Sequence, residues 1–144
     1  MSLYYFDNAR TPEQRAEMER LDGAGVCLFC PEHLVSHPRQ EILFSTEHWN
    51  ATTNAFPYPG TSLHLLLLPH QHVSDLLALT SEAQNDFWTA LAEVDKRYSL
   101  TSYGVGVRNG DLRLSGATIA HLHVHVLVAA NTDGAPTVRM RFSQ

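Results

Sequence analysis

Three histidines alternate with aliphatic residues in the segment ATIAHLHVHVLV, residues 117–128. They are His121, His123 and His125, and strict alternation of this kind is typical of a β-strand, whose successive side chains point to opposite faces. The segment therefore predicts three imidazoles on one face of a strand, with the aliphatic side chains in a core. Same-face neighbours lie about 6.6 Å apart along a strand. That spacing is too long for direct contact, but an ion or a phosphate group could bridge two of the rings.

Two cysteines form a second group with chemical potential. Cys27 and Cys30 stand in the sequence CLFC. A C-x-x-C pair is typical of a redox centre or of half a zinc site. Pro31 follows the second cysteine and the region reads as a loop rather than a helix start, which favours zinc over redox chemistry. Zinc needs two further ligands, and the chain has nine histidines. Loss of the metal in this chain is the main alternative.

Length and charge restrict the class of protein. The chain has 144 residues, which predicts one domain, and a formal net charge of −5. That charge argues against broad binding to a nucleic-acid polymer but leaves room for a small phosphorylated ligand. The longest apolar run, residues 65–68, is far shorter than the roughly 20 residues of a membrane span. The first ten residues lack the features of a signal peptide. We expect a cytoplasmic protein without membrane contact.

The predicted elements follow an α+β order. A first helix is predicted over 11–21, capped by Thr11 in a T-x-x-Q capping box, and a long helix over 79–98. Strands are predicted at 41–46, 48–53, 62–69 and 103–110 and in the histidine segment, with a further one at 137–142. Together they predict a sheet of mostly antiparallel strands with helices packed against it.

Other sites built from clustered histidines fit the sequence less well. A cupin-type metal site needs a glutamate soon after an H-x-H pair, but the next acidic residue is Asp133. A metallo-hydrolase of the H-x-H-x-D-H type needs an aspartate at the position of His125. Three consecutive same-face histidines on a strand also span too far to converge easily on one ion with bonds of about 2.1 Å.

The pattern H-φ-H-φ-H-φ-φ, with φ apolar, resembles the signature of the histidine triad (HIT) superfamily of nucleotide hydrolases and transferases. HLHVHVL fits it at every position, and CLFC, the stretch HLLLLPHQHVSDLLAL at 64–79, Asn109 and Gly116 extend the resemblance. It implies an α+β, HIT-like fold: an antiparallel sheet of about five strands with a main helix packed against it. The whole chain, 1–144, is expected to be one domain. It would have an N-terminal helical extension over about 1–25 and a family-like core over about 27–128.

The resemblance also implies roles for individual residues. His123 would be the nucleophile that attacks an α-phosphate and forms a nucleotidyl-histidine intermediate, with His125 and His64 binding phosphate or protonating the leaving group. Cys27, Cys30, His72 and His121 would form a closed structural zinc site. Asn54, Asn109 and Thr118 would contact a small nucleotide, such as a purine nucleoside phosphoramidate or a dinucleoside polyphosphate. Many relatives pair, so a homodimer is expected.

Two departures from the family pattern keep alternatives open. Ala117 stands where many HIT hydrolases have a phosphate-contacting glutamine, and Asn54 where they have a ribose-binding aspartate. An enzyme therefore competes with a non-catalytic nucleotide-binding or scaffolding protein that keeps the zinc site. A third reading is a metal-binding protein that uses the triad itself. Arg108 and Arg113 are either phosphate contacts or solvated loop residues.

Overall fold

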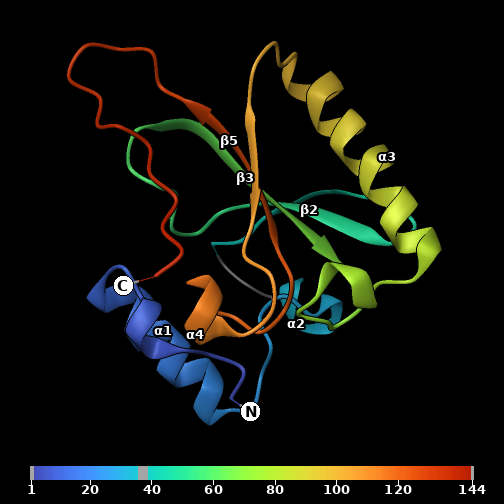
Figure 1. Cartoon of the computed structure of the whole chain (residues 1–144), viewed down its shortest axis with the longest axis vertical. Coiled ribbons are helices and arrows are strands. Elements are labelled where there is room, and N and C mark those ends of the chain that lie inside the picture. Colours follow the sequence, from blue (N-terminus) through green and yellow to red (C-terminus); the bar gives the residue numbers. More distant parts are fainter. Residues whose placement is uncertain (1, 36–38, 144) are drawn as a thin grey trace.

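A five-stranded antiparallel sheet organises the chain in the computed structural model (Figure 1), which describes residues 2–35 and 39–143. The strand order is β1-β2-β3-β5-β4, and every neighbouring pair is antiparallel. The strands are β1 Ile42–Ser45, β2 Trp49–Thr53, β3 Thr61–Pro69, β4 Gly104–Val107 and β5 Val124–Ala129. The predicted α+β architecture is confirmed.

The long helix α3, Ser81–Tyr98, covers one face of the sheet (Figure 1). Thr80 caps it by accepting a hydrogen bond from the amide of Ala83, and its apolar stripe is buried against the strands. Leu65 and Leu67 of β3 belong to this core, as do Leu122, Val124 and Val126 of the histidine segment. The aliphatic half of the alternating pattern is therefore buried in a core, as predicted, and this core packs against α3.

The opposite face of the sheet is covered by the N-terminal part of the chain. Leu66 and Leu68 of β3 are buried there with Met18 and Leu21 of α1, Pro12–Gly23. Thr11 caps α1 by accepting from the amide of Gln14, while the Gln14 side chain accepts from the amide of Arg10. The capping residue is thus as predicted, but the reciprocal bond reaches one residue further upstream.

The short elements connect these layers. They are η1 Phe6–Asn8, α2 Pro31–Leu34, η2 Leu76–Ala78 and α4 Leu112–Ser115. Tyr4 forms an isolated β-bridge with Ile119, and the amide of Tyr5 donates to the carbonyl of Thr118 at 3.0 Å. These bonds fix the N-terminal segment beside the histidine segment. Across the described residues, no helix has both the length and the apolar character needed to cross a membrane.

Two strand predictions are wrong. β5 begins at Val124, so His121 and His123 lie in the irregular segment before the strand. The amide of Leu122 donates to the carbonyl of Val73 at 2.7 Å instead of joining a ladder. Residues 137–142 form no strand either. They return to lie against Gly116, where φ is +82° and an added Cβ would be 2.8 Å from Phe142.

Candidate active site and metal centre

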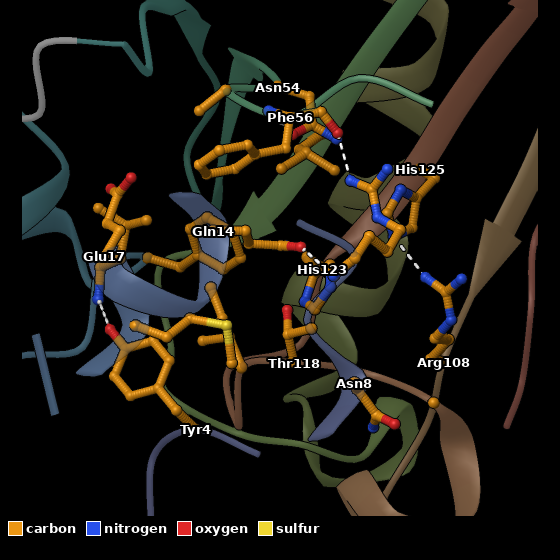
Figure 2. Close-up of a pocket in the computed structure, with 18 of the residues that line it drawn as sticks. Tyr4, Asn8, Gln14, Glu17, Asn54, Phe56, Arg108, Thr118, His123 and His125 are labelled. Atoms are coloured by element: carbon orange, nitrogen blue, oxygen red, sulfur yellow. Dashed lines mark hydrogen bonds between the residues drawn. The ribbon is translucent and has the colours of Figure 1, made fainter. Parts of the chain in front are cut away.

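A cavity lies between the histidine face of the sheet and the N-terminal segment. Figure 2 shows Tyr4 and Glu17 at one end, His125 and Arg108 at the other, and His123 between them. The apolar lining comes mainly from Met18, Leu21, Leu28, Phe29, Leu66 and Ile119, and the polar lining includes Asn54, Arg10, Arg108 and Thr118. The cavity is therefore apolar at one end and rich in hydrogen-bond donors at the other.

His123 is buried with a defined tautomer. Its Nδ1 lies 2.8 Å from the carbonyl oxygen of His121. Because a carbonyl oxygen can only accept, Nδ1 carries the hydrogen and Nε2 keeps its lone pair. Burial lowers the pKa of His123 to about 4, although the bond to the His121 carbonyl opposes this shift. The ring is therefore neutral near pH 7, the form in which imidazole is nucleophilic.

His64 and His125 form a hydrogen-bonded pair across β3 and β5. The amide of Tyr58 donates to Nδ1 of His64 at 3.0 Å, so the hydrogen of the neutral His64 ring is on Nε2. That Nε2 lies 2.8 Å from Nδ1 of His125 and donates to it. The hydrogen of neutral His125 is then on Nε2. Burial lowers the pKa of His64 to about 3 and that of His125 well below its usual range.

Two of the triad rings, those of His123 and His125, are in contact, contrary to the strand-based spacing. The ring centroids of His123 and His125 are 5.2 Å apart in an edge-on arrangement, and Phe29 packs 5.1 Å from His123. Contact arises because His123 precedes the regular strand. All three triad histidines are at most 6% exposed. The histidine face is therefore covered, and His123 and His125 face the cavity that they line.

The expected substrate contacts separate into two groups. Asn54 and Thr118 line the cavity (Figure 2), and the side-chain nitrogen Nδ2 of Asn54 lies 3.1 Å from Nε2 of His64. Asn109 is not among the residues that line it. Its side-chain oxygen accepts from the amide of Leu76 at 2.7 Å, so it orders the loop around η2. The placement favours a structural role for Asn109.

The arginines of the following loop also separate. Arg108 lines the cavity, and its Nη1 lies 3.4 Å from Nε2 of His125. Arg113 is exposed and pairs with Asp111 at 2.7 Å, outside the cavity. That carboxylate holds the guanidinium in the loop, so Arg113 is a surface residue.

Tyr58 and Arg10 are cavity residues that the sequence did not single out. Tyr58 is 5% exposed and stacks on His125 with ring centroids 5.4 Å apart. The guanidinium of Arg10 lies over the Tyr58 ring, 4.6 Å from its centroid, and donates to the carbonyl of Phe56. The Pro/Gly composition around Tyr58 indicated only a loop, and Arg10 lies in a region read as an extension. No sequence-spacing rule links Tyr58 or Arg10 to the histidines of the cavity, which are far away in the chain.

Cys27, Cys30, His72 and His121 converge at a second site. Their ligand atoms all lie within 4.8 Å of one another, so the group could hold a metal ion. Nδ1 of His121 is 3.6 Å from each sulfur, and Nδ1 of His72 is 3.3 Å from the Cys30 sulfur. Burial raises the pKa of the Cys30 thiol to about 12. A bound cation would favour the thiolate instead.

The ring of His121 is oriented for this second site. Its Nε2 lies 2.8 Å from the carbonyl of Pro69 and donates to it, which leaves the lone pair on Nδ1, the atom beside the two sulfurs. His121 is fully buried, and burial lowers its pKa to about 4. The ring is therefore neutral, as a metal ligand must be.

The HIT domain family model matches residues 37–132, and the chain belongs to this family. The Cys-x-x-Cys loop and α1 lie before the matched region. A curated relative, an "Uncharacterized HIT-like protein" from Chlamydia muridarum, is 29% identical over 76 residues. That match covers 49% of this chain and 57% of the relative.

Solved structures share the fold. A HIT family hydrolase from Clostridium thermocellum is 21% identical with a TM-score of 0.58, covering 78% of this chain and 96% of that one. A hypothetical protein from Leishmania major is 23% identical with a TM-score of 0.61, covering 82% and 86%. A zinc-bound histidine triad family protein from Mycobacterium smegmatis is 21% identical with a TM-score of 0.54, covering 82% and 85%. These likenesses confirm the predicted HIT-like fold.

Proposed function

We propose that the protein is a nucleotide phosphohydrolase or nucleotidyl transferase that works through a covalent nucleotidyl-histidine intermediate on His123. The observation that carries the proposal is the 2.8 Å contact between Nδ1 of His123 and the His121 carbonyl. It leaves an unprotonated Nε2 on a neutral ring that lines a cavity rich in cationic donors. An activated nucleophile beside donors for developing charge is the arrangement that covalent phosphoryl chemistry needs.

The proposed reaction has two steps. Nε2 of His123 forms a bond to the α-phosphorus, and the bond from phosphorus to the leaving atom breaks with its electron pair on that atom. Water then attacks the phosphorus, the N–P bond breaks with its pair returning to Nε2, and the water releases one proton to solvent. The carbonyl of His121 would stabilise the positive charge that the ring carries between the steps. His125 would donate a hydrogen bond from its Nε2 to a phosphate oxygen and keep its proton.

The two ends of the cavity suggest how a nucleotide would lie. The base would occupy the apolar end, which Met18, Leu28 and Phe29 line, and the phosphate would meet His123 and the donors beside it. Asn54 and Thr118 would contact the ribose or the phosphate between these ends. Because the apolar wall comes from the N-terminal segment, we also propose that the chain acts as one unit.

We propose that zinc occupies the Cys27, Cys30, His72 and His121 group. Bonds of about 2.3 Å to sulfur and 2.0–2.1 Å to nitrogen around a tetrahedral ion would place neighbouring ligand atoms about 3.3–3.8 Å apart. Four of the six pairs of ligand atoms lie 3.2–3.6 Å apart, close to that geometry, and all six pairs lie within 4.8 Å. Four protein ligands leave no open position, so the ion would be structural, and the thiolate-rich set favours zinc.

The alternative is a nucleotide-binding protein without turnover. Ala117 favours it, because this residue is 2% exposed and supplies no donor where many relatives have a glutamine. The decisive experiment incubates the protein with a dinucleoside triphosphate radiolabelled at the α-phosphorus and quenches it in denaturant at alkaline pH. Label on His123, absent from His123→Ala and retained by His48→Ala, is the expected result. His48 lies outside the cavity lining. Nucleotide binding without any covalent label would favour the alternative.

The homodimer and the cytoplasmic location stay predictions. β4 is an edge strand of the sheet, and Val105 on it is 47% exposed, which supports pairing of two copies along this edge. Sedimentation of the purified chain, beside a Val105→Glu variant, would test the dimer. If both proteins had the same solution mass, the β4 edge would be excluded as the dimer interface.

A further inference from the structure

Two guanidinium groups flank Tyr58 at the phosphate end of the cavity. Arg10 lies 4.6 Å and Arg108 5.6 Å from the centroid of its ring. Arg108 also donates to the Tyr58 hydroxyl and lies beside Nε2 of His125. Arg10 comes from the N-terminal segment, outside the matched HIT domain, whereas Arg108 follows β4. Tyr58 therefore holds a cation from each segment near the candidate reaction centre.

Among the described residues, no ion pair neutralises the positive charge at this end. Arg141 lines the cavity as well, so three arginines gather there, and each of Arg108 and Arg141 lowers the pKa of Arg10 further after burial has done so. Glu17 is the one acidic residue among the described lining, and it pairs with Arg39 at 2.8 Å. Within residues 2–35 and 39–143, none of the three arginines forms an ion pair. An anion would offset this charge.

Two hydrogen-bearing nitrogens at this end face each other, although Arg108 also donates from Nε to the carbonyl of Arg141 and from Nη1 to the Tyr58 hydroxyl. A guanidinium has five N–H groups, and one of those on Arg10 is used by the Phe56 carbonyl. Nη1 of Arg108 and Nε2 of neutral His125 both carry hydrogen, yet they face each other at 3.4 Å. An oxygen atom placed between these donors would accept from both. Phosphate oxygens match the arginine fork well.

The histidine pair makes a poor acid for the leaving group. If neutral His125 gave up its Nε2 hydrogen, it would become an imidazolate, because its Nδ1 accepts from His64 and carries no hydrogen. An amine leaving group needs such a proton. A phosphate leaving group does not, because it departs as a stable anion and needs only positive charge nearby.

We propose that Arg10, with Arg108 and Arg141, forms an anion subsite for a phosphoryl group attached to the α-phosphate, so that the protein selects substrates with a phosphate leaving group over those with an amine. The inference rests on the proposed function and deepens it. When Nε2 of His123 bonds to the α-phosphorus, the P–O bond to the next phosphate breaks and its electron pair stays on the leaving oxygen. Arg10 binds the charge that this oxygen gains.

The test compares two substrates that share one adenylyl group, a diadenosine triphosphate and an adenosine phosphoramidate. Arg10→Gln is expected to lower kcat/KM about 10- to 100-fold on the triphosphate and less than about 3-fold on the phosphoramidate. Arg15→Gln is the matched control, because Arg15 lies on α1, pairs with Glu19 and does not line the cavity. Equal losses on both substrates, or no loss on either, would overturn the subsite.

Calorimetry with inorganic triphosphate tests the subsite separately from turnover. Wild-type protein should bind this probe, and Arg10→Gln should weaken the binding about 10-fold. If no substrate is turned over but this binding pattern holds, the proposed function fails while the anion subsite stands. If Arg10→Gln does not fold, Arg141→Gln serves, because Arg141 is exposed at the cavity mouth. A smaller loss in the same direction supports the subsite, and unchanged binding contradicts it.

Discussion

Nδ1 of His123 donates to the carbonyl oxygen of His121 at 2.8 Å, while the ring of His121 joins the cysteine and histidine group that could hold a metal. One residue therefore belongs to both sites, through its side chain in one and its backbone in the other. Anything that moves His121 also changes the orientation of the candidate nucleophile. His121 therefore links the group of Cys27, Cys30, His72 and His121 to the cavity that contains His123.

The first prediction concerns metal content. Purified protein should hold about one zinc ion per chain, and removal by a chelator should lower the melting temperature by about 10 °C, since a closed site contributes directly to folding. Cys30→Ala should lose the metal, and His70→Ala, whose residue lies outside the group, should keep it. Metal-free protein with an unchanged melting temperature would sink the zinc proposal.

The second prediction follows from the shared residue. Cys30→Ala should lower kcat more than it raises KM, because the Nδ1 contact orients His123 for attack, whereas the base would bind at the apolar end of the cavity. Steady-state kinetics on one substrate, measured well below the melting temperature of the variant, would check this. A rise in KM with unchanged kcat would show that the metal group supports binding rather than orientation.

The third prediction separates the two triad histidines in the cavity. His123→Ala should abolish turnover, a loss of several orders of magnitude, and leave nucleotide binding nearly intact. His125→Ala should slow turnover less, by roughly 10²-fold, because it removes one donor and not the covalent route. Single-turnover kinetics on the same substrate would compare them. Near-wild-type activity in His123→Ala, or a covalent adduct on His125, would reverse the assignment.

The fourth prediction concerns pH and His64. Burial lowers the pKa of His64 from its ordinary 6.5 to about 3, so between these values the unfolded chain binds a proton that the folded chain does not. The stability from this residue is complete above pH 6.5 and is lost as the pH falls toward 3.

Comparison of His64→Gln with wild type isolates this contribution from other groups that titrate in the same range. In denaturant titrations from pH 6 to pH 4, the variant should lose stability less steeply, by about 1.4 kcal/mol per pH unit. Parallel curves for the two proteins would show that His64 is not buried in its neutral form.

The fifth prediction concerns the position next to the missing glutamine. Thr118 lines the cavity (Figure 2), and its hydroxyl is the side-chain donor closest in sequence to Ala117 on this wall. Thr118→Val, which keeps the shape and removes the hydroxyl, should lower kcat/KM about 3- to 10-fold. Thr101→Val, in an exposed turn, is the control. If the two variants had equal kcat/KM, the Thr118 hydroxyl would not bind the substrate phosphate, and only the histidines and arginines would contact it.

Local signals predicted much of this fold. The cap at Thr11, the end of the long helix at Tyr98 and the strand ending at Pro69 depend on residues close in sequence, and all three lie where the pattern placed them. The metal group was named from a family resemblance, and the fold brings its members together across 94 residues between Cys27 and His121. Hydrophobic periodicity and secondary-structure propensity alone could not have predicted that these four residues lie together.

Tertiary contacts decided the parts that sequence patterns missed. The segment before Val124 alternates like a strand, but the amide of Ala120 donates to the carbonyl of Leu3, so the N-terminal segment takes the place of a ladder partner. Residues 137–142 also look like a strand, yet the edge of β4 does not pair with them. The sequence did not predict Arg10 as a cavity residue, because a single arginine before a helix forms no periodic pattern.

The N-terminal segment has a consequence for how this chain is divided. The matched domain begins at residue 37, yet Cys27, Cys30 and Arg10 all precede it, and α1 walls the cavity. A fragment cut at the family boundary would keep the triad and lose half of the metal ligands together with one side of the pocket. We therefore propose that the functional unit extends beyond the matched domain, residues 37–132. Under the proposed function, a change at Arg10 or on α1 would therefore alter substrate selectivity without changing any residue of the matched domain.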